Sequence, residues 1–332
     1  MNLWAAMGCA GAAALACGTL TALLIPRLQG AQVIDVPNVR SLHARPVPRG
    51  GGLAIAAVVI VTQLGLIASG QWAMQTGFVT TLVATGFAAL GWADDRASRG
   101  VLLRLAVQSL LALLFVTLAL PAEPTATTRA LLWLALLWGV NLFNFMDGAD
   151  GLAGVQTMAA SLGLGVLLSI SAQTGAAMAA FTLAGAAAGF LRWNWHPARI
   201  FLGDVGSYFI GFELAALVIL SAQYAHSPWP ALILVAPFVL DATLTLVARA
   251  LRGAALWRAH REHVYQRLVL RGWSPARVAG GLAVLLIGLC WPGAAWSVID
   301  GVMPAMFVYG LLVIIWLWLR RSSSPPGSNL PI

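Results

Sequence analysis

Eleven long apolar segments constrain the fold of this chain more than any other feature. They cover residues 3–25, 52–69, 73–92, 101–120, 129–145, 153–171, 175–191, 206–222, 229–249, 278–298 and 302–319. An α-helix needs about 20 predominantly apolar residues to cross a bilayer. The chain is 60% hydrophobic and 9% charged, whereas a soluble domain carries about 25% charged residues. We therefore predict an all-α, polytopic membrane bundle of about 11 transmembrane helices. It forms a single domain over residues 1–321, followed by a disordered Ser/Pro-rich tail at 322–332.

The arginines predict how this bundle is oriented. All 19 basic residues are Arg, and the net charge is +8. When the loops are assigned to alternate sides, Arg129 stands alone on one side and all the other arginines fall on the other. Positive charge marks cytoplasmic loops, so we expect a periplasmic N-terminus and a cytoplasmic C-terminus. The same rule explains the net positive charge, so a nucleic-acid partner is not needed to account for it.

The cysteines and the N-terminus exclude two other interpretations. The three cysteines lie inside apolar runs and lack paired spacing, which argues against a disulfide framework or a zinc site. The first apolar run is too long for a signal peptide and lacks a charged start, so we expect a retained span.

A polar cluster interrupts the apolar pattern between residues 141 and 154. Two amides and two carboxylates recur every third residue, as Asn141, Asn144, Asp147 and Asp150. On a continuous helix each such step would drift by about 60° and turn the first and last groups apart. Glycines 148, 151 and 154 repeat with the same period. We therefore predict that the helix unwinds near Asp147 and that the later groups turn back into one site. The alternative is a capped helix end.

Two further loops on the predicted cytoplasmic side carry acids. Asp94 and Asp95 are adjacent at the end of a span, so they oppose each other unless a cation or proton lies between them. The alternative is a helix end neutralised by arginine. Asp204 stands between glycines just before the next span, where it is either a metal ligand or a simple N-cap.

The first loop is a candidate anion site. Its prolines hold the chain extended before Gly50, Gly51 and Gly52. Unpaired glycine amides together with three arginines, Arg40, Arg45 and Arg49, would attract phosphate. A basic loop that only sets topology is the alternative.

The loop from Arg249 to Arg277 contains His260, Arg261, His263 and Arg267. Three-residue spacing would place the two histidines on one helical face, where they could bind phosphate or metal. The alternative is an amphipathic helix on anionic lipid. Asp241, in the preceding span, either pairs with Arg249 or lines the site. Hard oxygen ligands near phosphate favour Mg²⁺, or Mn²⁺, over zinc.

These motifs together resemble the polyprenyl-phosphate N-acetylhexosamine-1-phosphate transferases of glycosyltransferase family 4. That family includes phospho-MurNAc-pentapeptide translocase. The resemblance covers about Asp35 to Trp273 and runs in the family's order. It rests on Asp35-Val-Pro-Asn, Pro-Val-Pro-Arg-Gly-Gly-Gly, Asp94-Asp95, Asn144-Phe-Met-Asp147-Gly-Ala-Asp150-Gly, Phe201-Leu-Gly-Asp204-Val-Gly-Ser and His260-Arg-Glu-His263-x-Tyr-Gln-Arg. The motif style is closest to the enzymes that start O-antigen and other surface glycans.

The resemblance implies transfer of an N-acetylhexosamine-1-phosphate from a UDP-sugar to undecaprenyl phosphate, with release of UMP. It implies a site on the cytoplasmic face of the bacterial inner membrane, with Mg²⁺ held by Asp204 and Asp95. The implied catalytic residues are Asp94, Asp95, Asp147, Asp150, His260 and His263. The implied substrate-binding residues are Arg45, Arg49, Gly51, Asn144, Asn194, Arg261 and Arg267. A homodimer is one assembly open to such a chain.

Three questions stay open at the level of sequence. A Lys that is common in the family's first-loop motif is absent, and either Arg45 or Arg49 supplies its charge. Asp94 could take a residual proton from the lipid phosphate, or an Asp could act as a nucleophile and form a covalent intermediate. Outside this class, an ion-coupled transporter would use Asp147, Asp150 and Asp241. The empty outer loops argue against that alternative.

Overall fold

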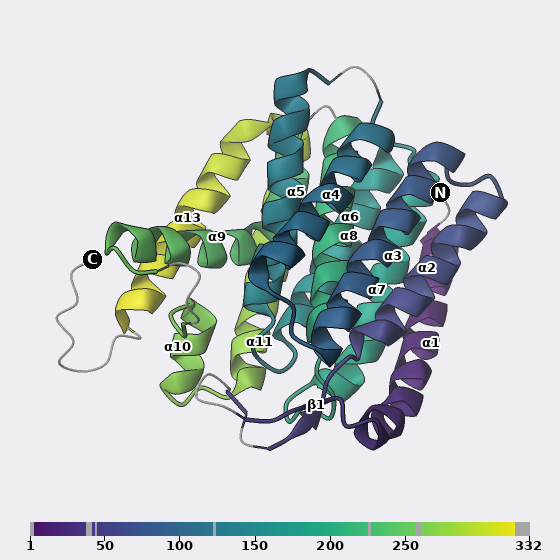
Figure 1. Ribbon diagram of the computed structural model, residues 1–332. Helices are drawn as coiled ribbons and strands as arrows, with labels where there is room; N and C mark the ends of the chain where they lie inside the picture. Colours follow the sequence, from purple (N-terminus) through teal and green to yellow (C-terminus); the bar gives the residue numbers. More distant parts are fainter. Residues whose placement is uncertain are drawn as a thin grey trace.

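The computed structural model describes residues 3–37, 42–43, 45–121, 124–224, 227–255 and 260–322. Figure 1 shows a bundle of long helices. They are α1 (Leu3–Gly30), α2 (Gly52–Ala68), α3 (Met74–Arg96), α4 (Val101–Leu118), α5 (Ala126–Met146), α6 (Leu152–Ile170), α7 (Thr174–Asn194), α8 (Gly203–Tyr224), α9 (Trp229–Leu251), α10 (Val264–Leu270), α11 (Pro275–Leu285), η1 (Leu286–Cys290), α12 (Trp291–Asp300) and α13 (Val302–Ser322). Apart from Ser322, which ends α13, the predicted tail lies outside the described residues.

The predicted all-α membrane bundle is confirmed. Within the described ranges, ten helical segments are long and apolar enough to cross a membrane. One of them, Pro275–Asp300, joins α11 to α12 through the π turn of η1. The shorter apolar helix α2 accounts for the remaining predicted span. Each apolar segment of the sequence therefore falls on a helix, because only an internally hydrogen-bonded backbone is stable in hydrocarbon.

Helices α7 and α8 form the centre of the bundle. Small residues let α1 approach α7 very closely: a Cβ placed on Gly185 or Gly189 would lie 2.1 Å from a backbone oxygen of α1. Helix α8 packs between α2, α3 and α5. The centre is therefore closely packed, as expected where small residues drive helix association in a membrane.

Two glycines fix the start of α8 against its neighbours. A Cβ on Gly91 of α3 would lie 2.2 Å from the Asp204 carbonyl oxygen, and one on Gly52 would lie 2.1 Å from the Gly206 Cα. No other residue type fits at either crossing. The first turn of α8 is thus held directly against the end of α3 and the start of α2, which brings separate acidic segments together.

The glycine-rich first loop is used for backbone pairing, in contrast to the open anion site that we predicted. The amides of Gly51 and Gly52 donate to the carbonyl oxygens of Phe201 and Leu202, each at 2.9 Å. Just before them, β1 (Ile34–Asp35) and β2 (Val47–Pro48) form a short antiparallel ribbon. For Gly51 and Gly52 the prediction of bare amides is wrong, because pairing with the segment before α8 satisfies both.

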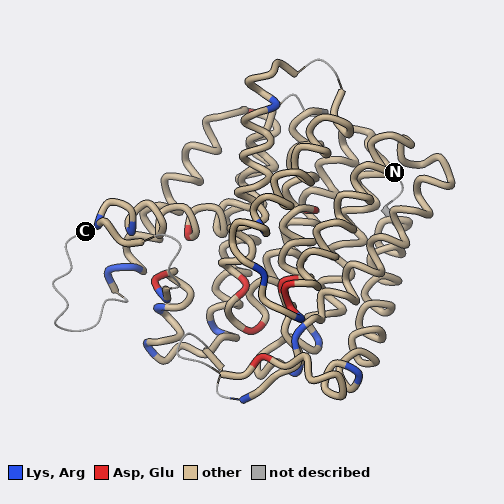
Figure 2. Tube along the Cα trace, viewed as in Figure 1, with Lys and Arg blue, Asp and Glu red and all other residues tan. Residues whose placement is uncertain are grey.

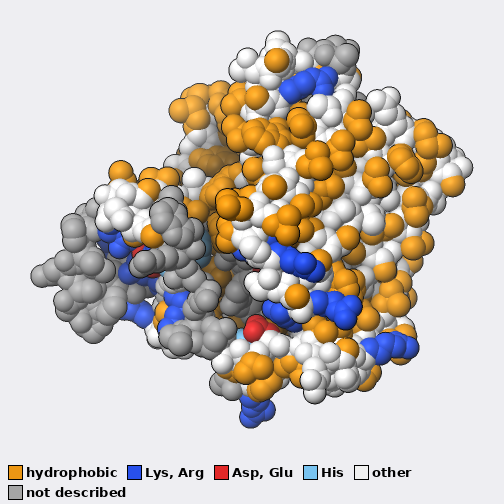
Figure 3. Space-filling view, viewed as in Figure 1, with side chains coloured by type: hydrophobic (Ala, Val, Ile, Leu, Met, Phe, Trp, Pro, Cys, Tyr) orange, Lys and Arg blue, Asp and Glu red, His pale blue; other side chains and the backbone are white. Residues whose placement is uncertain are grey.

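The arginines gather at one end of the bundle, as Figure 2 shows. Arg129, in the first turn of α5, lies at the other end. Figure 3 shows apolar side chains in a broad band across the middle of this face, with arginines below it. The charge asymmetry inferred from the sequence is therefore present in three dimensions.

Candidate active site

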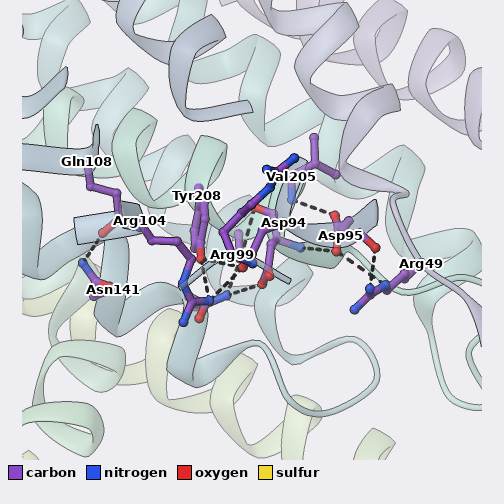
Figure 4. Close-up of polar contacts among 12 residues, drawn as sticks. Arg49, Asp94, Asp95, Arg99, Arg104, Gln108, Asn141, Val205 and Tyr208 are labelled. Carbon is purple, nitrogen blue, oxygen red and sulfur yellow. Dashed lines mark hydrogen bonds and ion pairs between the residues drawn. The ribbon is translucent and has the colours of Figure 1, made fainter. Parts of the chain in front are cut away.

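Asp94 and Asp95 end α3 but point to different partners, as Figure 4 shows. Asp94 accepts hydrogen bonds from the Arg99 amide at 2.5 Å and from Arg104 Nη1 at 2.7 Å. Asp95 accepts from the amides of Asp204 and Val205, both at 3.0 Å. Successive residues on a helix are turned by about 100°. The two carboxylates therefore bond to separate segments, and a cation between them stays a prediction.

Asp95, on α3, caps the N-terminus of α8. Its carboxylate binds the first free amides of α8, where the helix dipole favours negative charge. Arg49 lies beside it, with Nε 3.7 Å from Asp95 Oδ1 and Nη2 donating to the Asp95 carbonyl oxygen. The first loop, α3 and α8 are therefore tied together at one point.

A polar cavity of about 350 Å³ opens at this point. Seven of the predicted site residues line it: Arg49, Asp95, Asn144, Asp147, Asp150, Asn194 and Asp204. Asp35, His43, Phe201 and Gln266 are also in its wall. The polar clusters of four separate loops thus meet in one cavity, as the sequence predicted.

Asn144 and Asp204 form the most ordered part of the cavity wall. Asn144 Nδ2 donates to Asp204 Oδ1 and to Ser207 Oγ, each at 2.8 Å. This leaves oxygen atoms of Asp204 and Asn144 facing the same space. Together they offer the hard oxygen ligands that Mg²⁺ prefers.

Asp147 lies at the end of α5, where the helix unwinds as predicted. The next helix begins after Gly151, which has a φ of 76°. Burial, together with the charges of Asp204 and Asp95, raises the pKa of Asp147 to about 8. Within the described residues, no hydrogen-bond donor reaches its carboxylate. A cation in the cavity would relieve this repulsion.

Asp150 and Asn194 hold the loops that shape the cavity. Asp150 Oδ2 accepts from His196 Nδ1 at 2.7 Å and from the Ala198 amide at 3.1 Å. Asn194 accepts from the Gly151 amide at 3.0 Å and donates to the Ile200 carbonyl oxygen at 2.9 Å. Both residues line the cavity, yet their observed bonds join the 147–151 turn to the loop before α8.

The two histidines lie before α10 and do not share a helical face. His263 is the residue that caps α10, and His260 lies in the loop, with 4.9 Å between the ring centroids. The predicted spacing argument was wrong because α10 begins at Val264, after both histidines. Burial, with the charges of His263 and Arg249, lowers the pKa of His260 to about 4; burial also lowers the pKa of His263. Both imidazoles are therefore neutral at pH 7.

Asp241 has a structural partner that the sequence did not indicate. Its carboxylate accepts from the Val264 amide at 3.0 Å and from Trp316 Nε1 at 3.1 Å, and so caps α10 from α9. Arg249 pairs instead with Glu262. Asp241 lines neither the polar cavity nor the groove described next.

An apolar groove of about 790 Å³ leads away from the cavity between α4, α5 and the end of α9. Its apolar wall is formed by Leu105, Leu134, Leu137 and Leu246 together with Trp138, Phe145 and Val101. His260, His263 and Tyr265 line its polar end, and it shares Asn144, Asp147, Gly148 and Gln266 with the cavity. A hydrocarbon chain and a charged headgroup could therefore be held in one continuous space.

Five predicted site residues line neither space: Asp94, Arg45, Gly51, Arg261 and Arg267. Arg45 is exposed, and Arg267 lies near Arg252, Arg271 and Glu262. Sequence reasoning missed Arg104 and Tyr208, which line the groove and bind Asp94. An Arg inside the first turn of an apolar helix was the available signal for Arg104, but we counted it only toward topology.

The carboxylates of the cavity fit a metal ion whose remaining ligands come from the substrate. Among the described residues, no group of three or more His, Cys, Asp or Glu side chains could enclose a metal ion. Mg²⁺ in phosphate-transfer sites is often bound by one or two carboxylates plus substrate phosphates. Asp204 and Asp147 on one cavity wall meet that requirement.

Comparison with known proteins gives a consistent assignment. Residues 77–222 match the family described as Glycosyl transferase family 4. A probable undecaprenyl-phosphate N-acetylglucosaminyl 1-phosphate transferase of Bacillus subtilis is 30% identical over 86% of this chain and 81% of its own length. A decaprenyl-phosphate N-acetylglucosaminephosphotransferase of Mycolicibacterium smegmatis is 31% identical over 90% of this chain and 84% of its own length. A phospho-N-acetylmuramoyl-pentapeptide-transferase of Synechococcus is 31% identical over 86% of this chain and 92% of its own length.

Proposed function

The chain belongs to glycosyl transferase family 4, and from that premise we propose that it transfers an N-acetylhexosamine-1-phosphate from a UDP-sugar to undecaprenyl phosphate, releasing UMP. One observation carries the proposal: the acidic cavity and the apolar groove share a wall at Asn144, Asp147 and Gly148. A soluble nucleotide-sugar fits the polar cavity and a lipid fits the groove. Their phosphates would meet at the shared wall.

The reaction exchanges one P–O bond for another. An oxygen of the lipid phosphate attacks the sugar-linked phosphorus of the UDP-sugar. The bond from that phosphorus to the bridging oxygen breaks, and UMP leaves with the electron pair. Because the acceptor phosphate is already largely ionised, the protein's main tasks are to align the two phosphates and to neutralise their charge.

The residues of the polar cavity would bind the metal and neutralise the phosphates. Mg²⁺, or Mn²⁺, held by Asp204 and Asp147, would neutralise the pyrophosphate. Asp95 orients Asp204 through the first turn of α8 rather than binding the metal itself. Arg49 contributes positive charge in place of the missing Lys, because Arg49 lines the cavity whereas Arg45 is exposed.

The groove residues hold the lipid phosphate. His260 and His263 are neutral donors at the polar end of the groove. Asp94 lines neither space, and its carboxylate bonds Arg99, Arg104 and the side chain of Asp204. We therefore assign Asp94 the role of positioning Arg104 on the groove wall and Asp204 in the cavity, in place of the proton acceptor inferred from sequence.

The orientation and the pathway complete the proposal. The arginine-rich end would face the cytoplasm of a bacterial cell, at the inner membrane, because positive charge favours that side. The motifs Pro-Arg-Gly-Gly-Gly and His-x-x-His-x-Tyr-Gln-Arg favour a role at the start of O-antigen or another surface glycan. An ion-coupled transporter is not favoured, because the site acids Asp147, Asp150 and Asp204 share one cavity at one end of the bundle.

Release of UMP tests this function. Purified protein would be given undecaprenyl phosphate, Mg²⁺ and each of several UDP-N-acetylhexosamines. We expect UMP with at least one donor, and loss of turnover in EDTA that Mg²⁺ or Mn²⁺ restores. Folded protein that releases no UMP with any donor would exclude the transferase.

Asp204→Asn tests the proposed metal ligand, because an amide keeps the hydrogen bond to Asn144 but removes the charge. We expect turnover to fall at least about 100-fold, roughly 2.7 kcal/mol of transition-state stabilisation. Asp300→Asn is the matched control, since Asp300 ends α12 and bonds only to Trp296 within the described residues. Equal activity of the two variants would remove Asp204 from the mechanism.

A further inference from the structure

A net positive cluster lies where α9, α10 and α13 end. Five arginines interact there with two acids: Arg249, Arg252, Arg267, Arg271 and Arg320 with Glu262 and Asp241, a net charge of +3 among the described residues. Figure 2 shows these basic segments gathered at the left of the molecule. The cluster is separate from the polar cavity, since none of these seven residues lines it.

The two acids in the cluster are already engaged. Glu262 bonds Arg249 and lies 2.5 Å from Arg252 Nη2. Asp241 caps α10 and accepts from Trp316. Burial, with the nearby charges of Arg252 and Arg271, lowers the pKa of Arg267. Among the described residues of the cluster, the arginines outnumber the acids, so the potential there favours an anionic headgroup.

An apolar pocket of about 260 Å³ lies beside the cluster. Helices α9, α10, α11 and α13 form its walls, and Asp241 is the only charged residue among those lining it. Trp316 is part of the lining, and the Arg320 guanidinium carbon lies 4.9 Å from the centroid of its ring. The pocket therefore lies next to the arginine cluster.

This combination indicates a ligand with a hydrocarbon chain and a negative headgroup. Helices α9 and α13, and α11 with α12, are long and apolar enough to span a membrane, so the surrounding bilayer supplies such molecules directly. We propose that the pocket binds an anionic phospholipid, with an acyl chain between α9, α11 and α13 and its phosphate at the arginine cluster. Basic pockets between membrane helices on the cytoplasmic side bind such headgroups in general.

The pocket is distinct from the groove proposed for the acceptor lipid. Tyr265 stands between the two and lines both. Its hydroxyl group donates to the Phe145 carbonyl oxygen at 3.0 Å. A bound acyl chain would pack against the far side of Tyr265 and support α10, whose first residue adjoins His263. The phospholipid thus acts as a structural partner and not as a substrate.

Two pairs of variants separate the headgroup from the chain. Arg320→Gln removes one charge of the cluster, and Arg192→Gln at the end of α7 is its control. Gly281→Leu fills the pocket: Gly281 lines it, and an added Cβ would meet no atom within 4 Å. Gly280→Leu is its control, because Gly280 also has free space but does not line the pocket.

Native mass spectrometry of the full chain in detergent would measure binding of phosphatidylglycerol against phosphatidylcholine. We expect the wild type to retain phosphatidylglycerol preferentially. Arg320→Gln should weaken its binding about fivefold, as expected for one arginine near a lipid headgroup. Gly281→Leu should abolish it, and both control variants should bind like the wild type. Thermal unfolding would confirm that each variant is folded.

Several results would overturn the proposal. Equal retention of the two phospholipids would exclude headgroup recognition, and unchanged binding in Gly281→Leu would place the lipid elsewhere. Displacement of phosphatidylglycerol by inorganic phosphate alone would make the cluster a free-anion site. Displacement by undecaprenyl phosphate, lost in Gly281→Leu, would assign the pocket to the acceptor lipid.

Discussion

At the scale of single residues, the hydrogen bonds of the acids decide their roles. Asp94 and Asp95 are neighbours in the chain, yet one binds Arg104 and the other caps α8. Asp147 carries no such bond among the described residues and faces two other carboxylates. Among the acids that line the cavity, Asp147 is therefore the one whose charge a cation would stabilise most. The hydrogen bonds of Asp95 and Asp150 hold the segments around it.

Gly148 gives a direct test at this scale. A Cβ at this position would lie 2.2 Å from the Tyr265 hydroxyl oxygen. Overpacking of this kind costs about 1–3 kcal/mol, so Gly148→Ala should reduce UMP release about tenfold or more by moving Tyr265 and the histidine loop. The double variant Gly148→Ala/Tyr265→Phe removes the clashing atom and should recover activity. Steady-state assays of both variants measure the effect.

Tyr265→Phe alone is the control for that experiment. It loses the bond to Phe145, worth about 1 kcal/mol, and should keep most of its activity. If the double variant is no more active than Gly148→Ala, the close contact with Tyr265 does not limit the reaction.

At the scale of elements, polar pairs fix how helices meet. Gln63 of α2 donates to Glu213 Oε1 of α8 at 2.8 Å, and both side chains are buried. Glu262 in the loop before α10 joins Arg249 and Arg252 near the end of α9. The Gln63–Glu213 pair connects helices that are far apart in sequence, whereas Glu262 joins two consecutive elements. The first pair is expensive to break, because its partner would be left behind in an apolar environment.

Gln63→Leu should destabilise the bundle without touching the site. The variant leaves the buried Glu213 carboxyl group without its donor, at a cost of about 1–3 kcal/mol. Thermal unfolding in detergent should show a lower Tm than for Gln71→Leu, whose amide is exposed. A Tm equal to that of this control would mean that the pair contributes nothing to α2–α8 packing.

Glu262→Gln should show a pH-dependent loss of stability. Burial acts to raise the pKa of Glu262, but its bonds and charges with Arg252 and Arg249 outweigh burial and lower it. A carboxyl group whose pKa falls on folding stabilises the fold above its unfolded pKa of about 4.3. That contribution disappears as the pH falls through the lower folded pKa. We expect a loss of about 1 kcal/mol at pH 7, measured by thermal unfolding.

The wild type and Glu262→Gln should then converge in Tm at pH values below the folded pKa of Glu262. A constant difference in Tm at every pH would show that lost packing, and not the ion pair, causes the effect.

At the scale of the whole molecule, charge and hydropathy are segregated along one axis. The apolar band in Figure 3 separates the arginine-rich end from the end that carries Arg129. The candidate site lies at the arginine-rich end, beside Arg49. This placement is consistent with a donor that arrives from the cytoplasm and an acceptor that arrives from the bilayer.

Cysteine labelling tests this orientation. In a chain whose three native cysteines are replaced by alanine, Thr127→Cys and Ser322→Cys mark opposite ends; both positions are exposed. A membrane-impermeant maleimide should label Thr127→Cys in cells whose inner membrane is intact, and Ser322→Cys only after permeabilisation. The reverse pattern would invert the bundle and place the site outside the cell.

The membrane class, the helical segments and the convergence of the acidic loops could all be predicted from the sequence. These follow from local properties, because hydropathy sets which segments enter hydrocarbon and arginine sets which loops stay outside it. Even the unwinding near Asp147 was visible in the spacing of Asn144, Asp147 and Gly151. Only the tertiary structure decided which groups touch. Asp95 caps α8 and Asp241 caps α10 across long sequence separations. The Gly51 amide, predicted to bind an anion, pairs with Phe201 instead. Such partners depend on how helices cross, and close crossings are set by small residues such as Gly91, whose effect no local pattern reveals.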